Sequence, residues 1–161
     1  MDVVIRSLAT TLLALAIPLA SAQTLSLTIA NTVEATVAGQ APIMKNLQFV
    51  FRVNGCADLS KAKVAATAEG IVGNARRTIA LDPRPVQTQP GVYAIGDQWG
   101  TDGTWVVAIT ANCESATAGA IVQINARTFV RDGTQFFSRA PSPADIETAL
   151  KAYASPVSVP R

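Results

Sequence analysis

The sequence contains no histidine, and this absence excludes several kinds of chemistry. Without imidazole there is no histidine general acid or base, no Ser-His-Asp triad and no imidazole-based metal site. Apart from Met1 the chain has only Met44, too few for a copper site built from several methionines. The glycines fall at turns between apolar segments, and none forms a phosphate-binding loop ahead of a helix. We therefore expect a protein that is not an enzyme, with no catalytic residue, no metal ligand and no cofactor.

Charge is sparse, and neither sign dominates. The 161 residues include 13 Lys and Arg and 11 Asp and Glu, which gives a net charge of +2. The basic residues are scattered, and Arg76-Arg77 is their only adjacent pair. So weak and dispersed a positive charge predicts no nucleic-acid partner and no electrostatic attachment to a membrane.

Residues 1–22 have the pattern of a secretory signal peptide. Arg6 supplies the positive end, Leu8–Leu19 is the apolar stretch, and Ala20-Ser21-Ala22 is a small-residue cleavage site. The apolar stretch is short and contains Pro18, so we expect no stable membrane insertion once the signal is cleaved. An uncleaved anchor is the alternative. The pattern predicts an exported protein, periplasmic or extracellular.

Cysteine is limited to Cys56 and Cys113. In an exported protein an even pair predicts one disulfide. Cys56 follows one predicted strand and Cys113 ends another, so both are expected at the same end of a sandwich. Two free buried thiols are the alternative. A two-thiol metal or redox site is disfavoured because the sequence has no CxxC spacing.

Alternation of apolar and polar residues predicts strands along most of the remaining chain. The most regular strand, 45–54, places Phe49 and Phe51 on one face and Arg52 on the other, where a helix would spread them around its circumference. Residues 62–68 are rich in alanine, so a helix is the alternative to a strand there. Further strands are predicted at 24–30, 32–38, 77–81 and 120–130, with an open loop at 70–74 and a proline-rich breaker at 82–85.

The stretch from Pro90 to Cys113 contains both tryptophans of the chain. Its segments 91–95 and 105–111 alternate as strands, and with Asp102-Gly103 between them they predict an antiparallel hairpin. We expect Tyr93 and Trp105 in the core together with Phe49 and Phe51.

Trp99, Asp97 and Asp102 lie near the tip of this expected hairpin and form our candidate binding surface. Two acids beside an aromatic ring suit sugar chemistry, but acids at hairpin ends commonly serve as turn formers. Trp99 is open to two interpretations, a lid on the core or a half-exposed contact residue.

The last part of the chain, 132–161, is expected to be a tail with one short helix. Arg131-Asp132-Gly133 predicts a turn. Ser142 as N-cap and Pro143 at the first position predict a helix over about 143–153. Its apolar stripe is expected to pack on the parent domain, with a partner site as the alternative. The stripe consists of Ile146, Ala149, Leu150 and Tyr153.

These segments together predict an all-β protein, an immunoglobulin-like antiparallel sandwich of seven or eight strands over 23–131. A closed eight-stranded barrel is the alternative. The motifs FVFRVNG, AKVAATAEG, PGVY and GTWVVAI, within 45–125, resemble the YtkA-like and FixH-like bacterial envelope proteins. That resemblance implies an immunoglobulin-like domain broadly similar to the CopC fold, located in the cell envelope. In some members Met and His in the segment after the Ala-x-Val strand imply metal handling; here this segment, 69–74, contains neither.

We expect a non-catalytic exported domain that acts by binding another envelope protein or an extended ligand. Two alternatives belong to other classes of function. One is a copper-related accessory domain, as the resemblance implies, and the other is a hydrolase that uses carboxylates.

Overall fold

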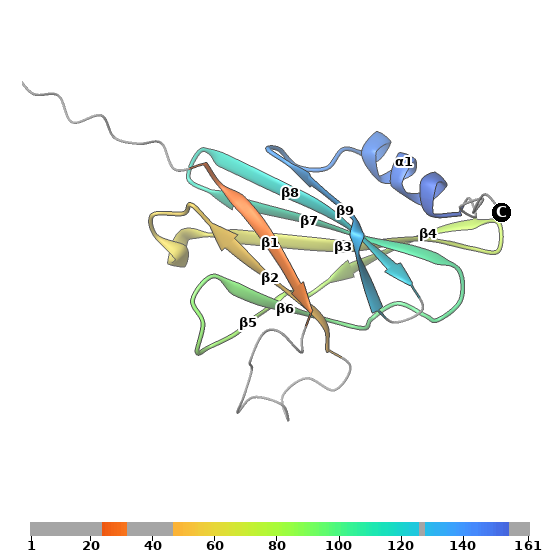
Figure 1. Cartoon of the computed structure of the whole chain (residues 1–161), viewed down its shortest axis with the longest axis horizontal. Coiled ribbons are helices and arrows are strands. Elements are labelled where there is room, and N and C mark those ends of the chain that lie inside the picture. The colour runs from red at the N-terminus through yellow and green to blue at the C-terminus, as the bar shows by residue number, and fades with distance from the viewer. Residues whose placement is uncertain (1–23, 32–46, 126–127, 155–161) are drawn as a thin grey trace, which may run out of the picture.

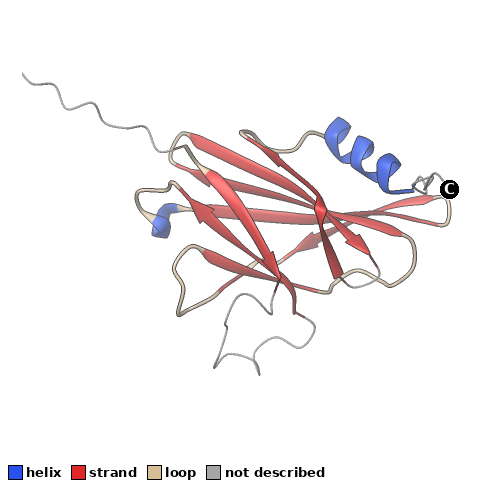
Figure 2. Cartoon of the chain, viewed as in Figure 1, coloured by secondary structure: helices blue, strands red, loops and turns tan. Residues whose placement is uncertain are grey.

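The computed structural model describes residues 24–31, 47–125 and 128–154, which form two antiparallel sheets in two layers (Figure 1). The first sheet has the order β1 (Ser26–Asn31), β2 (Leu47–Asn54), β6 (Val92–Gly96), β5 (Arg84–Pro85). The second has the order β4 (Ala75–Leu81), β3 (Lys63–Val72), β7 (Thr104–Cys113), β8 (Ala116–Asn125), β9 (Thr128–Phe137). A 3₁₀ turn (Leu59–Lys61) and the helix α1 (Pro143–Ala154) are the helical elements of this part of the chain (Figure 2).

The strand order confirms the expected sandwich. The first sheet corresponds to strands A-B-E-D of an immunoglobulin domain and the second to C′-C-F-G, with β9 added beyond G. The expected number of strands was too low, because the described residues contain nine. The predicted strand 120–130 is in fact parts of two strands, β8 and β9, and the proline-rich breaker at 82–85 contains the short β5.

The expected core is present between the sheets. Phe49, Phe51 and Trp105 are buried, and the half-buried Tyr93 stacks on Phe51 with ring centroids 5.4 Å apart. The alanine-rich segment 62–68 belongs to a strand, β3, as predicted. Its small inward residues leave room for Trp105, which stands opposite Gly70 in the register. A Cβ at Gly70 would overlap the Trp105 ring, so glycine is needed there for close packing.

The predicted hairpin of 91–95 with 105–111 is wrong. β6 pairs with β2 and β5, whereas β7 pairs with β3 and β8, so the two strands lie in different sheets. Residues 97–103 cross from one sheet to the other, a gap of about 10 Å that such a segment spans easily. The glycine turn signal is nevertheless used, because Gly103 has φ 87° and lies against the carbonyl group of Ile71.

Two turn predictions are corrected by the register. Residues 70–74 are not an open loop: β3 continues to Val72, which pairs with Ala75 around the tight turn Gly73-Asn74. Arg131-Asp132-Gly133 lies within β9, so the sheet extends to Phe137 and not only to 131. Val130 pairs with Gln123 and Gln135 with Ile121, which places residues 131–134 opposite a single residue, Val122, as a β-bulge. The predicted signal peptide and the strand 32–38 lie outside the described residues.

The predicted disulfide is confirmed. Cys56, just after β2, is bonded to Cys113 at the end of β7, with their Cα atoms 5.8 Å apart. The bond therefore joins the two sheets at one end of the sandwich, corresponding to the B–F position of immunoglobulin domains.

The helix α1 covers the outer face of the second sheet. Its residues Ile146, Ala149 and Leu150 are buried against an apolar patch made of Val106, Ala108 and Ile121. This packing confirms that the stripe faces the parent domain. No helix in the described part of the chain is long and apolar enough to cross a membrane.

Candidate binding groove

Of the candidate surface residues, Asp102 is exposed and Asp97 is half-buried, but Trp99 is buried and contributes no ring to a surface. All three belong to the crossover 97–103, but Trp99 is only 5% exposed and packs into the main core. Trp99 is therefore a lid on the core and not a half-exposed contact residue. The Asp102 main-chain oxygen accepts a hydrogen bond from Trp105 Nε1 at 2.8 Å, so its role in the structure is to hold a core side chain.

The acidic and thiol groups of the described residues do not gather into a metal site. No three of their Asp, Glu or Cys side chains come together as a metal ion would require. Both thiols are used in the disulfide.

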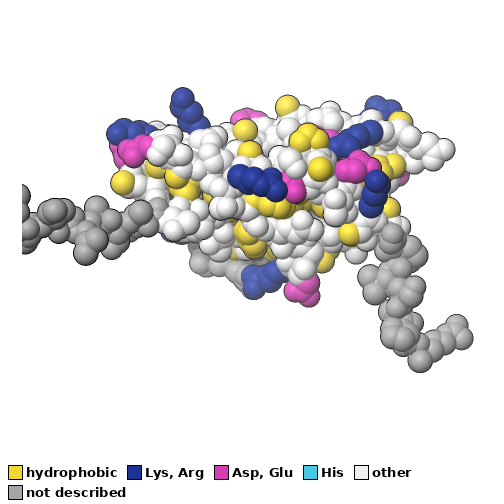
Figure 3. All heavy atoms as spheres, turned by 90° about the horizontal axis from the view of Figure 1, so that it is seen from above, with side chains coloured by type: hydrophobic (Ala, Val, Ile, Leu, Met, Phe, Trp, Pro, Cys, Tyr) yellow, Lys and Arg dark blue, Asp and Glu magenta, His cyan; other side chains and the backbone are white. Residues whose placement is uncertain are grey.

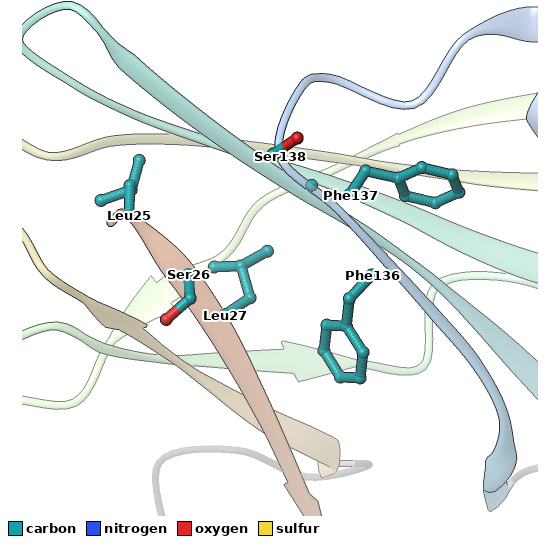
Figure 4. Close-up of a pocket in the computed structure, with 7 residues that line it drawn as sticks. Leu25, Ser26, Leu27, Phe136, Phe137 and Ser138 are labelled. Carbon is teal, nitrogen blue, oxygen red and sulfur yellow. The ribbon is translucent and has the colours of Figure 1, made fainter. Parts of the chain in front are cut away.

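A groove of about 370 Å³ lies between β1 and β9 instead, at the open side of the sandwich (Figure 4). Figure 4 shows Leu27 and the Phe136 ring pointing into the space between the two strands, while Phe137 points to the other side of β9. The lining residues are mostly apolar: Leu25, Ser26, Leu27, Gly119, Phe136, Phe137 and Ser138.

The groove exists because the two sheets have unequal numbers of strands. The first sheet has four strands and ends at β1, whereas the second has five and continues past β8 to β9. Phe136 pairs with Ala120, whose side chain is in the core, so Phe136 projects from the inner face of its sheet. It is nevertheless 56% exposed, the one large apolar side chain exposed in the described part of the chain. Phe136 is exposed there because none of the described strands of the first sheet covers this part of β9.

The groove is uncharged. Its lining residues include no acid and no base. On the other face of β9 the Arg139 guanidinium lies 5.2 Å from the centre of the Phe137 ring, in a cation–π contact. Seen from above in Figure 3, Lys and Arg are scattered with Asp and Glu beside them, and they form no single basic patch.

The end of β9 is held in place by the segment that leads to α1. This segment crosses β8 at Gly119, where an added Cβ would come 2.5 Å from the main-chain oxygen of Arg139. Arg139 then forms two hydrogen bonds to the carboxylate of Asp145, 2.6 and 3.1 Å long. Asp145 also accepts from the main-chain N–H of Ser142 at 2.7 Å, and Ser142 Oγ accepts from the Asp145 N–H at 3.2 Å. This is a capping box in which aspartate replaces the usual glutamate.

Acid is expected to weaken this attachment. The Arg139 guanidinium and then Ser142 lower the pKa of Asp145 below its ordinary value of 3.8. A carboxylate with a lowered pKa stabilises the folded state above its ordinary pKa, and this stabilisation is lost as the pH falls through the lower folded value. Asp145→Asn should therefore reduce the free energy of unfolding at pH 7. The difference in free energy of unfolding between the variant and the unchanged protein should shrink as the pH falls below 3.8, the ordinary pKa of the group.

Urea unfolding of both proteins at several pH values between 7 and 2.5 measures this difference. Asp82→Asn is the matched control. The Asp82 side chain is 81% exposed, and its ion pair with Arg84 is long, with 3.9 Å between Oδ2 and Nε. Its effect should be small at every pH. A difference for Asp145→Asn that does not change with pH would contradict the role of the charge.

Phe136 was not among the predicted site residues, for a local reason. Arg131-Asp132-Gly133 has the composition of a turn, so the residues after it were assigned to the tail. The sequence feature that could have identified it is the apolar pair Phe136-Phe137 directly after a polar segment.

Searches against known protein families, curated proteins and solved structures find no match to this chain.

Proposed function

We propose that the protein is an exported, non-catalytic domain that binds another envelope protein through the groove between β1 and β9. Three features support export: the signal-peptide pattern of residues 1–22, the disulfide, and the resemblance to YtkA-like and FixH-like envelope proteins. Disulfides persist mainly in oxidising compartments such as the periplasm and the cell exterior.

The observation that carries the proposal is the exposed inward face of Phe136. An aromatic ring on the inner face of a sheet normally contributes its burial to the core, yet this ring is 56% exposed beside buried Leu25 and Leu27. An exposed aromatic ring inside an apolar groove is suited to anchor a partner, because aromatic residues are enriched among the anchors of protein interfaces.

The lining of the groove favours binding over catalysis. The polar side chains among its described residues are Ser26 and Ser138. A serine nucleophile needs an adjacent base, and no basic or acidic side chain lines the groove. An apolar side chain of a partner fits this environment without loss of hydrogen bonds.

The test uses a photo-crosslinking phenylalanine analogue at position 136 in the full chain, exported in its native host. A discrete adduct with one envelope protein is expected. That protein, once purified, should bind the unchanged chain and bind Phe136→Ser at least tenfold more weakly, because a central aromatic anchor contributes about 2 kcal/mol or more.

Position 135 provides the control. Gln135 precedes Phe136 on the same strand, is exposed and faces the opposite side of the sheet. The analogue at 135 should give no such adduct, and Gln135→Ala should leave binding unchanged. Adducts that are the same from both positions, or absent from both, would contradict a binding site at the groove.

A further inference from the structure

The main-chain groups along the outer side of β1 follow from one hydrogen bond. Val53 N–H donates to the Gly91 oxygen at 2.9 Å, so the main-chain groups of Val53 face β6. Because these groups alternate in direction along a strand, those of its neighbour Arg52 face β1, where its register partner is Thr28. The amide and carbonyl groups of Leu27 and Ile29 must then point away from β2, toward the groove.

No other strand of the described chain occupies that side of β1. β1 pairs with β2 alone, and none of the main-chain hydrogen bonds made outside the strand pairs of the described residues involves Leu27 or Ile29. The row of donors and acceptors at this edge therefore runs alongside the groove.

The other three sheet edges carry features that prevent pairing, and among the described residues β1 has none of them. β5 is two residues long and contains Pro85, β4 carries Arg76 and Arg77, and β9 is interrupted by its bulge. Short strands, proline, charge and bulges are the means by which sheet edges avoid association. β1, SLTIAN, has no charge and no proline, and it pairs with β2 through six consecutive residues without a bulge.

The space beside β1 corresponds to one missing strand. Neighbouring strands lie about 4.8 Å apart, and a strand added to β1 would lie over the uncovered part of β9. Its inward side chains would pack against the buried Leu27 and cover the exposed Phe136 ring. The first sheet would then have as many strands as the second.

We infer that β1 is the docking edge for an extended, uncharged segment of the partner, which adds as a fifth strand to the first sheet. This inference rests on the proposed function and specifies how that binding occurs. The segment has apolar side chains at alternate positions, because only every second side chain faces the groove. It carries no charge on that face, since a charge there would lose its hydration without gaining a partner among the uncharged lining residues.

The probe for this inference is a synthetic peptide with the sequence of residues 25–31, blocked at both ends and extended by a Gly-Ser tail. It is uncharged and has alternating apolar residues, as the edge requires. Amide exchange is measured by NMR on the isotope-labelled full chain, purified after export. At about 90% occupancy, the amides of Leu27 and Ile29 should exchange about tenfold more slowly, whereas Thr28, already bonded to β2, should not change.

A second peptide separates main-chain pairing from apolar contact. Two versions of the peptide are N-methylated at every second amide, one in each phase, and both keep all side chains. In only one of them does methylation remove the donors that face β1. Of the two methylated peptides, the one that loses the pairing donors should give no protection of Leu27 and Ile29. Phe136→Ser should weaken binding of the unmodified peptide, and Gln135→Ala should not.

Three results would overturn the inference. The first is equal binding of the unmodified peptide and both methylated peptides; this would exclude strand addition but leave the groove, and the adduct at position 136, as a binding site. The second is slow exchange of the Leu27 and Ile29 amides in the absence of peptide. If this slowing increases with protein concentration, the edge pairs with a second copy of the chain. If it does not depend on concentration, the edge pairs with another segment of the same chain. The third is no binding of any peptide at millimolar concentration. The proposed function fails separately, through the absence of the adduct.

Discussion

Trp105→Ala is expected to lower the free energy of unfolding by about 3–5 kcal/mol, the range for truncating a large aromatic residue in a core. The Trp105 side chain is 5% exposed, and its ring lies directly against Gly70 of β3. Removing it would leave a cavity between the sheets and take away the donor to the Asp102 oxygen. A loss of this size is a large fraction of the total stability of an ordinary domain.

Urea unfolding of Trp105→Ala and Trp99→Ala provides the comparison. Since Trp99 is as buried as Trp105, at 5% exposure, its truncation should fall in the same range. A contact residue at the surface would instead give a loss below about 1 kcal/mol. A small loss for Trp105→Ala would show that its ring is not part of the core.

Gly70→Ala supplies an independent check on the position of the Trp105 ring. The added methyl group would overlap the ring in the unchanged protein, an overpacking that costs about 1–3 kcal/mol. In the Trp105→Ala background the ring is gone, so most of that cost should disappear. Additive effects of the two substitutions would mean that the residues do not touch.

Replacing both cysteines, Cys56→Ser with Cys113→Ser, is expected to lower the free energy of unfolding by about 4 kcal/mol. The bond joins residues separated by 57 positions, and a loop of that length loses this much chain entropy when it is closed in the unfolded state. The loop includes β3, β4 and β6, so the bond restrains both sheets together.

Chemical unfolding of the double variant measures this effect, and the reduced form of the unchanged protein is the matched control. Reduction removes the same cross-link without new side chains, so both should lose similar stability. If the double variant were as stable as the oxidised protein, the restraint on the unfolded chain would have no energetic role. If it lost stability but the reduced protein did not, the added serines would be the cause.

Features that depend on residues close in sequence were determined by the sequence itself. The alternation around Phe49 and Phe51 predicts β2, because a strand places every second side chain on one face. The helix was predicted from Ser142 and Pro143, and the structure places the first residue of α1 at Pro143. The disulfide was predicted because the chain has only two cysteines and they follow or end strands.

Which strands become neighbours was decided only by the tertiary structure. Tyr93 and Trp105 lie on strands separated by a good turn signal, but alternation gives the face of a strand and not its partner. In the structure β6 joins β2 and β7 joins β3, so Tyr93 and Trp105 reach the core from opposite sheets, and tertiary packing overrides the local preference for a hairpin. The same reasoning explains the buried Trp99, which the crossover places between the sheets.

The groove also depends on tertiary structure. Phe136 is exposed because the second sheet has one strand more than the first, and a count of strands in each sheet is a property of the whole assembly. The turn-forming residues 131–133 could be accommodated as a bulge only because β8 was available as a partner on one side. The sequence therefore determined the strands, the cross-link and the helix, whereas long-range pairing determined which edge and which aromatic ring remain uncovered.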